Sequence, residues 1–299
     1  MTHHIFIVNP AAGKADRSEA IEKAINSARE QNAVTGEVTI YRTSCAGDAT
    51  AYLTRTLPEF DGDVRVYACG GDGTLNEVAA GLMTLSSPPP LGYFPQGSTN
   101  DFAASLKISG DPEEAVQAVL RAQPRQLDVG MWNERSFVYV ASFGAFTRSS
   151  YSAPQSVKNA LGHLAYILEG VKDLDTLRPY RIRLTADGEV LDGEYLFGAV
   201  CNSTSIGGLM KLDSERVVLD DGKFEMLLIP NPKTPGDLQK LVMALLEQKY
   251  DREGLVFRHV SSIHLQTEED LPWSLDGEYA PSQPEVTVEN RCRALTMLL

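Results

Sequence analysis

Four short apolar runs in the first hundred residues each end in a polar loop and are followed by a helical pattern. The first run, His4–Val8, is apolar almost throughout, which is typical of a strand buried on both faces. Strands that alternate with helices imply parallel pairing and right-handed crossovers. The pattern therefore predicts a doubly wound, mainly parallel α/β sheet. Ligands bind such sheets at the carboxyl ends of the strands, where all four loops fall. The loops are residues 9–14, 43–47, 70–74 and 95–101.

The third loop is rich in glycine and has the features of a phosphate-binding turn. The apolar run Val64–Cys69 ends in Gly70-Gly71-Asp72-Gly73, and a helical pattern follows. We expect the glycines to permit positive φ and close approach of a ligand to the main chain. Unpaired N–H groups at the start of the helix suit a phosphate. Asp72 would repel that phosphate unless a cation or a hydroxyl proton lies between them. The alternative is a tight turn in which Asp72 caps the helix.

The chain length and a change in the predicted secondary structure indicate two domains. A chain of 299 residues is long enough for about two separate cores. From residue 125 onward, short β-rich runs separated by turns replace the strand–helix alternation, and Ser136–Phe143 and Val256–Gln266 each read as one strand. We predict an α/β domain over residues 1–124 and a mainly antiparallel β-sandwich or partly closed barrel over residues 125–292. Helices are expected near 155–174 and 235–249, and the tail 293–299 is expected to pair back onto the first domain.

Composition excludes several classes of function. A net charge of −13 argues against non-specific binding of nucleic acid, and against strong general attraction to anionic lipid. The four cysteines are scattered without a CxxC pair, which fits free thiols in a reducing compartment. No signal peptide precedes the first strand, and no apolar run approaches the roughly 20 residues that span a bilayer. We therefore expect a cytoplasmic protein.

Two further acidic stretches follow predicted strands or turns. In residues 97–102, hydroxyl and N–H groups could hold phosphate oxygens, and Asp101 could hold Mg²⁺-bound water. The alternative for this stretch is plain N-capping by Thr99 or Asn100. The other stretch, residues 273–279, contains Asp276-Gly277-Glu278. Taken alone, that sequence favours a solvated hairpin tip.

Together these stretches form a recognisable motif set. The stretches are Asn9-Pro10 with Gly13-Lys14, then Gly70–Glu77, Ser98–Ala103 and Leu275–Glu278. This set resembles that of the diacylglycerol kinase-type lipid kinases, the superfamily that includes sphingosine and ceramide kinases. The resemblance covers essentially the full chain in the family's order. The Gly-Gly-Asp-Gly-Thr turn is moderately specific by itself, since NAD kinases and phosphofructokinases carry similar turns, but the combination is specific.

The resemblance implies a nucleotide-binding α/β domain, a β-rich second domain and an active site in the cleft between them. It also implies which residues contact ATP. Ser98 stands where the family usually has threonine, and it keeps the hydroxyl. Lys14 could meet a phosphate or a lipid headgroup, or it could be a solvated side chain. The residues assigned to ATP are Asn9, Lys14, Thr43, Gly70, Gly71, Asp72, Gly73, Thr74, Leu75, Asn76 and Ser98.

The same resemblance assigns the acidic residues. Asp276 aligns with the general base of bacterial members, and Asp72, Asp101 and Glu278 would complete a network that holds Mg²⁺ and water. Because the proton acceptor differs between branches of the family, Asp72 and Glu278 remain alternatives to Asp276. Physical chemistry agrees, since phosphoryl transfer to an alcohol needs neutralised phosphates, an oriented hydroxyl and a carboxylate that takes its proton.

A second Mg²⁺ site is also implied by the resemblance. Bacterial members bind a structural Mg²⁺ through an aspartate and neighbouring carbonyls, which here would be Asp221 with the carbonyls of Val218 and Lys223. Oxygen ligands from a turn suit a hard cation. The alternative is that Asp221-Gly222 forms an ordinary hairpin turn.

The expected function is ATP- and Mg²⁺-dependent phosphorylation of a lipid hydroxyl, on diacylglycerol or a related long-chain alcohol. The expected partner is a lipid substrate at the membrane surface, met by peripheral contact at the inner membrane face, and a homodimer is left open. Two alternatives stand beside this function. One is an NAD kinase-like phosphotransferase with a soluble acceptor, and the other is a non-catalytic regulator that binds lipid or nucleotide.

Overall fold

The computed structural model describes residues 2–13, 18–31, 34–98, 100–144, 178–206, 210–212, 217–247, 249–250 and 254–299. The helix expected near 155–174 lies outside these residues. The chain divides into two compact units, unit 1 with Met1–Val129 and Arg293–Leu299, and unit 2 with Gly130–Cys292. Strands β5 (Pro124–Trp132) and β17 (Glu285–Leu298) each have residues in both units.

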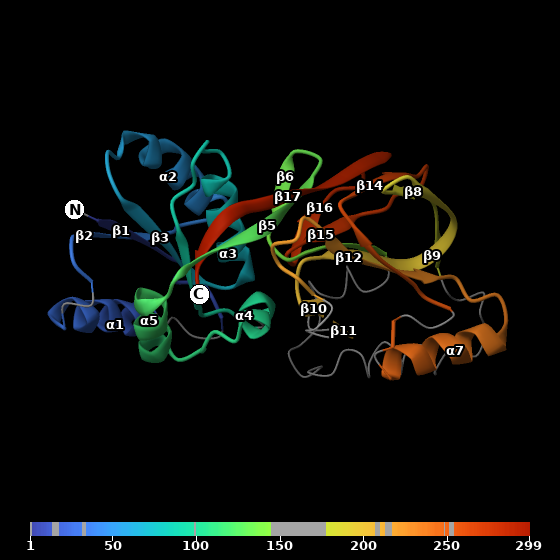
Figure 1. Cartoon of the computed structure of the whole chain (residues 1–299), viewed down its shortest axis with the longest axis horizontal. Coiled ribbons are helices and arrows are strands. Elements are labelled where there is room, and N and C mark those ends of the chain that lie inside the picture. The colour runs from blue at the N-terminus through green and yellow to red at the C-terminus, as the bar shows by residue number, and fades with distance from the viewer. Residues whose placement is uncertain are drawn as a thin grey trace. The chain divides into compact units, whose positions relative to one another are not determined.

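Unit 1 contains a parallel sheet in the order β2-β1-β3-β4, with the end of β17 beside β4 (Figure 1). Ile5, Phe6 and Ile7 of β1 have no exposed surface, so consecutive residues are buried on opposite faces of the sheet. This double burial explains the unbroken apolar run in the sequence. The strands are β1 (His3–Val8), β2 (Glu37–Arg42), β3 (Val64–Gly70) and β4 (Leu91–Pro95).

Helices cover both faces of this sheet. Helices α1 and α5 pack on one face, where Ile25 and Val116 join a core with Phe6 and Tyr67. Helices α2 and α3 lie together on the other face (Figure 1). The predicted doubly wound α/β architecture is thus confirmed. The helices are α1 (Ser18–Glu30), α2 (Asp48–Thr56), the 3₁₀ turn η1 (Leu57–Glu59), α3 (Asp72–Leu82), α4 (Asp101–Leu106) and α5 (Pro112–Arg121).

Unit 2 is built from antiparallel strands, as predicted. The main order is β16-β15-β7-β9-β8-β14-β17, and β12 pairs with both β9 and β13. Its core includes Trp132 and Trp273, whose rings meet edge to face. No described helix of either unit is long and apolar enough to cross a bilayer. The remaining elements are β6 (Arg135–Phe137), β7 (Val140–Gly144), β8 (Tyr180–Ala186), β9 (Glu189–Cys201), β10 (Ser205–Ile206), β11 (Met210–Lys211), β12 (Phe224–Pro230), α7 (Pro235–Leu246), β13 (Val256–Val260), β14 (Ser262–Gln266), β15 (Trp273–Leu275) and β16 (Glu278–Ala280).

Two runs that the sequence predicts as single strands are each broken in two. Ser136–Phe143 divides into β6 and β7, and Val256–Gln266 divides into β13 and β14. At the first break the Asp276 carboxylate accepts backbone N–H groups, and at the second the Asp187 carboxylate does so. A side chain from a distant turn thus takes the amides that a continuous ladder would use.

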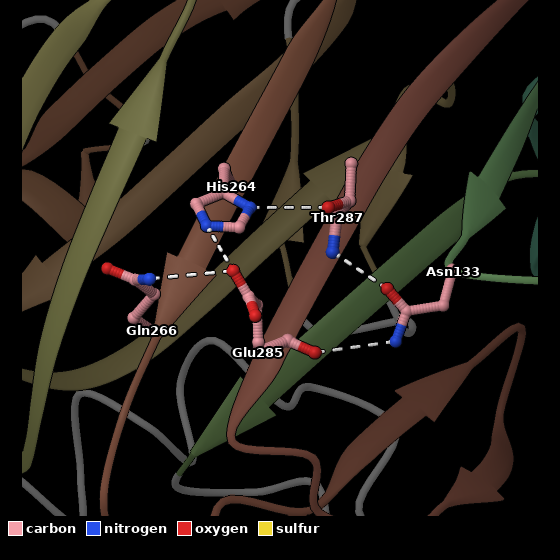
Figure 2. A network of polar contacts seen from close by, with 5 residues as sticks. All are labelled: Asn133, His264, Gln266, Glu285 and Thr287. Carbon is pink, nitrogen blue, oxygen red and sulfur yellow. Dashed lines mark hydrogen bonds and ion pairs between the residues drawn. The ribbon is translucent and has the colours of Figure 1, made fainter.

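A polar network holds the β5–β6 turn to the outer face of β14 and β17 (Figure 2). Asn133 Oδ1 accepts the Thr287 backbone N–H at 2.8 Å. The Thr287 hydroxyl lies 3.2 Å from Nδ1 of His264, whose Nε2 lies 2.9 Å from a Glu285 carboxylate oxygen. His264 is therefore a satisfied surface residue of the sheet.

Candidate active site

The phosphate-binding candidate is the turn from β3 into α3. Gly71 is the N-cap of α3, and as a glycine it has no side chain with which to cap this helix end. The first N–H groups of a helix have no partner within that helix, which suits them to bind an anion. The alternative in which Asp72 caps its own helix does not hold, because its carboxylate faces a different helix.

Close packing, rather than positive φ, explains two of the glycines in this turn. Gly71 has φ −88°, and Gly70 likewise lies outside the positive-φ region, so the expected left-handed backbone is wrong here. A Cβ on Gly70 would lie 2.3 Å from the Thr74 hydroxyl oxygen. One on Gly97 would lie 2.5 Å from Gly71 Cα. The two strand-end loops therefore touch backbone to backbone, which any side chain would prevent.

The neighbouring strand-end loops are tied to the same turn. Asn9 Nδ2 donates to the Thr74 hydroxyl at 3.0 Å, and the Asn9 backbone N–H donates to the Cys69 carbonyl at 2.9 Å. The Thr43 backbone N–H donates to the Val8 carbonyl at 2.9 Å. Among the described residues, the structure therefore gathers Asn9, Thr43 and Thr74 at one sheet edge, as the parallel topology predicts.

Asp72 organises the fourth loop. Its carboxylate accepts the backbone N–H of Asp101 at 3.1 Å and that of Phe102 at 3.5 Å, and so caps α4. Helix α4 receives no cap from its own N-cap residue, Asn100, which has φ 53° and bonds back to Gly97 instead. The alternative of N-capping by Asn100 therefore does not hold, and Thr99 lies outside the described residues. Burial raises the pKa of the Asp72 carboxyl above its usual value.

Tyr93 is a neighbour of Asp72 that sequence reasoning missed. Its hydroxyl lies 3.4 Å from an Asp72 carboxylate oxygen and 3.5 Å from Asn100 Oδ1. The side chain is fully buried on β4, and burial raises the pKa of its hydroxyl. A tyrosine inside an apolar strand run was the available signal, because a buried hydroxyl usually has a polar partner.

In unit 2, Asp276 has a structural task that the sequence does not reveal. Its side chain is 2% exposed, and its carboxylate accepts the backbone N–H groups of Val138, Tyr139 and Val140 at 2.6, 2.9 and 2.9 Å. Glu278 lies two residues later, on the exposed side of the hairpin. The hairpin is therefore formed as expected, but Asp276 points into the protein rather than into solvent.

The proposed structural Mg²⁺ loop forms a compact turn. The carboxylate of the exposed Asp221 accepts the backbone N–H of Lys223, two residues later, at 2.9 Å, which is the geometry of an Asx-turn. Asn202 Nδ2 donates to the Leu219 carbonyl and holds this turn from the side, next to the exposed Val218. Among the described residues, no group of three or more His, Cys, Asp or Glu side chains could hold a metal ion.

The predicted residues thus fall into separate groups. Asn9, Thr43, the turn 70–76, Asp101 and the exposed Ser98 belong to unit 1. Asp276 and Glu278 share one hairpin of unit 2, and Val218, Asp221 and Lys223 share a loop of the same unit. Lys14 and Thr99 lie outside the described residues.

Sequence comparisons match both parts of the chain. Residues 3–132 match the family model of the diacylglycerol kinase catalytic domain. Residues 140–299 match that of the YegS C-terminal NAD kinase beta sandwich-like domain. A diacylglycerol kinase of Bacillus subtilis (strain 168) is 33% identical over 282 residues, which cover 93% of this chain and 90% of the relative. One from Staphylococcus aureus (strain MRSA252) is 30% identical over 279 residues, covering 93% and 87%.

Solved structures share the fold. A diacylglycerol kinase structure from Bacillus anthracis str. Sterne has a TM-score of 0.70 at 23% identity, covering 99% of this chain and 96% of that one. Another structure from the same organism has a TM-score of 0.77 at 24% identity, with the same coverage. Identity at this level carries the fold alone. The sequence relatives and the family models show the family, and the solved structures agree in fold. The chain belongs to the diacylglycerol kinase family of enzymes.

Proposed function

We propose that this chain transfers the γ-phosphate of ATP to the hydroxyl of a lipid in a Mg²⁺-dependent reaction, with diacylglycerol as the first candidate acceptor. The observation that carries the proposal is the start of α3, which has a glycine N-cap, packs against neighbouring strand-end loops and is flanked by the half-buried Asp72 carboxylate. Such a turn can bind phosphates through backbone N–H groups. The sequence relatives named as diacylglycerol kinases support a lipid acceptor.

Residues of unit 1 would bind the nucleotide. Residues 70–76 would cradle the phosphates, with backbone N–H groups of the first turn of α3 donating to phosphate oxygens and Thr74 held in place by Asn9. Thr43 and the exposed Ser98 offer further hydroxyl groups at the same sheet edge. Because hydrogen bonds hold these loops together without a ligand, we expect little further ordering when the phosphates bind.

The donor set of unit 1 fits a small cation that prefers oxygen ligands. Asp72 is a half-buried carboxylate whose pKa is raised by burial, so a nearby cation would stabilise its ionised form. Mg²⁺ needs only one or two carboxylates beside phosphates and water, so the lack of a three-residue cluster among the described residues does not conflict with it. When bound, Mg²⁺ would neutralise charge on the phosphates.

The acceptor hydroxyl must lose its proton during the transfer, and a carboxylate that acts as general base can accept that proton. We assign it to Asp276, as the family resemblance does, with Asp72 and Glu278 as the alternatives. The three amides that bind Asp276 fix its orientation. A base held in one orientation can act without rearranging, provided that the substrate hydroxyl reaches one of its oxygens.

The test incubates the protein with γ-labelled ATP, Mg²⁺ and a total lipid extract, and identifies the labelled product. Parallel reactions offer diacylglycerol in mixed micelles, and NAD as the soluble acceptor suggested by the description of the second domain. We expect label in a lipid phosphate, enhanced by added diacylglycerol and abolished by EDTA. Label on NAD instead, or ATP binding with no transfer to any lipid, would contradict the proposal.

A further inference from the structure

Glu77 of α3 joins two helices in a way that its motif does not explain. Its Oε1 accepts the backbone N–H of Gly47 at 2.8 Å, and its Oε2 accepts that of Ala49 at 3.3 Å. These amides belong to the first turn of α2, whose N-cap residue, Gly47 at φ 81°, has no side chain of its own with which to cap the helix. A carboxylate from another helix therefore does the capping.

The contact between α2 and α3 is close along its length. The Thr50 hydroxyl donates to the Glu77 carbonyl at 2.7 Å. A Cβ on Gly81 would lie 3.1 Å from Leu53 Cβ, so the two helices already touch at this point. These contacts place the Glu77 carboxylate directly beside the loop that precedes α2.

That loop, residues 43–47, is fixed at its other end as well. The Thr43 N–H donates to the Val8 carbonyl, as described above. Asp48 accepts the Ser44 N–H at 2.7 Å and the Tyr41 hydroxyl at 2.9 Å, and these bonds to Ser44 and Tyr41 keep its pKa below the usual value. The loop is thus an ordered segment, and Glu77 connects it to α3.

We propose that Glu77 is a positioning residue for the nucleotide, which locks the Thr43 loop to the helix whose first turn forms the phosphate cradle. This inference rests on the proposed function, since it takes ATP as the ligand of both elements. With the lock in place, Thr43 and residues 70–76 keep one fixed spacing. Without it, the loop moves relative to the cradle, and binding the nucleotide requires that the loop be ordered again.

The experiment compares Glu77→Ala with Asp111→Ala. Asp111 caps α5 by accepting the N–H groups of Glu113 and Glu114 at 3.0 Å each, so its loss also removes two helix-end hydrogen bonds in unit 1. ADP binding is measured by calorimetry, and kcat and KM for ATP by kinetics. For Glu77→Ala we expect the ADP Kd and the ATP KM to rise about tenfold with kcat within about twofold. Asp111→Ala should keep the wild-type Kd and KM.

A second variant and a second measurement guard against a merely structural effect. Glu77→Gln keeps one acceptor oxygen, so it should recover part of the lost affinity. Hydrogen exchange over residues 43–49 should speed up in Glu77→Ala and stay unchanged in Asp111→Ala. Equal loss of affinity in both alanine variants, or wild-type affinity in Glu77→Ala, would overturn the assignment. A wild-type protein that binds no ADP would instead remove the proposed function itself, and the nucleotide role of Glu77 with it.

Discussion

Two hairpins of unit 2, β8–β9 and β15–β16, have the same Asp-Gly dipeptide as their turn, and in both the aspartate bonds to a distant strand. Asp187-Gly188 has φ values of 44° and 92°, and Asp276-Gly277 has 50° and 90°. Positive φ at both central positions is the mark of a type I′ turn. In each hairpin the aspartate carboxylate then accepts backbone N–H groups where a distant strand is broken.

The two aspartates differ in burial. Asp187 is exposed and binds the amides and hydroxyls of Ser261 and Ser262. Asp276 is buried and binds three successive amides. Because Asp187 shows that this turn organises a strand break without any catalytic assignment, the contacts of Asp276 do not by themselves indicate catalysis. Its proposed role as a base must therefore be measured separately from its contribution to stability.

The largest effect is expected for Asp276→Asn. An amide nitrogen would face backbone N–H donors in a buried site, so we expect the free energy of unfolding to fall by about 3 kcal/mol. If Asp276 is also the base, kcat per folded molecule should fall at least about 100-fold. Urea denaturation gives the stability, and kinetics corrected for the folded fraction give kcat.

Asp187→Asn is the matched control for that variant. Its exposed site should lose only about 1 kcal/mol, with kcat unchanged. If Asp276→Asn keeps wild-type kcat per folded molecule, the two hairpins are equivalent, and the proton acceptor must be sought at Asp72 or Glu278.

Asp72→Asn should separate chemistry from stability in unit 1. The asparagine oxygen can still accept one of the two α4 amides, so the free energy of unfolding should change by less than about 1 kcal/mol. Loss of the charge beside the proposed phosphate cradle should lower kcat about 100-fold or more. Circular dichroism and steady-state kinetics on the same preparation test this contrast with Asp276, and a large loss of stability would contradict it.

Alanine at the two turn glycines should give smaller and nearly equal losses. A Cβ added at Gly188 or at Gly277 would meet no atom within 4 Å, so strain at positive φ is the main cost, about 1 kcal/mol each. Thermal unfolding of Gly188→Ala and Gly277→Ala measures it. Activity lost in Gly277→Ala alone, at equal stability, would indicate that a ligand approaches this turn and would sharpen the difference between the hairpins.

Protonation of His4 should lower the stability of unit 1 in mild acid, and this is the smallest of the expected effects. Burial lowers the pKa of His4 below its usual 6.5, so the neutral ring stabilises the fold above that pH, and stability is lost as pH falls below 6.5. In unit 2, desolvation raises the pKa of Asp187, but hydrogen bonds from Ser261 and Ser262 outweigh it and hold that pKa below its usual 3.8. The stability that ionised Asp187 contributes is therefore lost only when the pH falls below 3.8.

The two units can be followed separately. Both tryptophans, Trp132 and Trp273, lie in unit 2, so their fluorescence reports that unit, while hydrogen exchange of β1 reports unit 1. In His4→Gln, the stability of unit 1 measured by hydrogen exchange of β1 should no longer fall between pH 7 and pH 5. An unchanged pH response in that variant would exclude His4 as the cause.

The sequence predicted the elements that local patterns specify. The apolar run of β1 and the strand–turn–helix at Gly70–Asn76 were read correctly, because burial on both faces and the period of a helix leave direct marks in neighbouring residues. It failed where a distant side chain intervenes. The breaks after β6 and β13 arise from Asp276 and Asp187, whose partners are more than 70 positions away in the chain.

The sequence by itself determined the strand–helix alternation of the first half, the antiparallel second half and the set of acidic loops that marks the family. Only the tertiary structure decided what individual residues of those motifs contact. Asp72 caps α4, Glu77 caps α2, and Gly70 and Gly71 permit close packing rather than a left-handed backbone. The physical reason is that a hydrogen bond or a backbone contact depends on where distant segments meet in space, which no local pattern encodes.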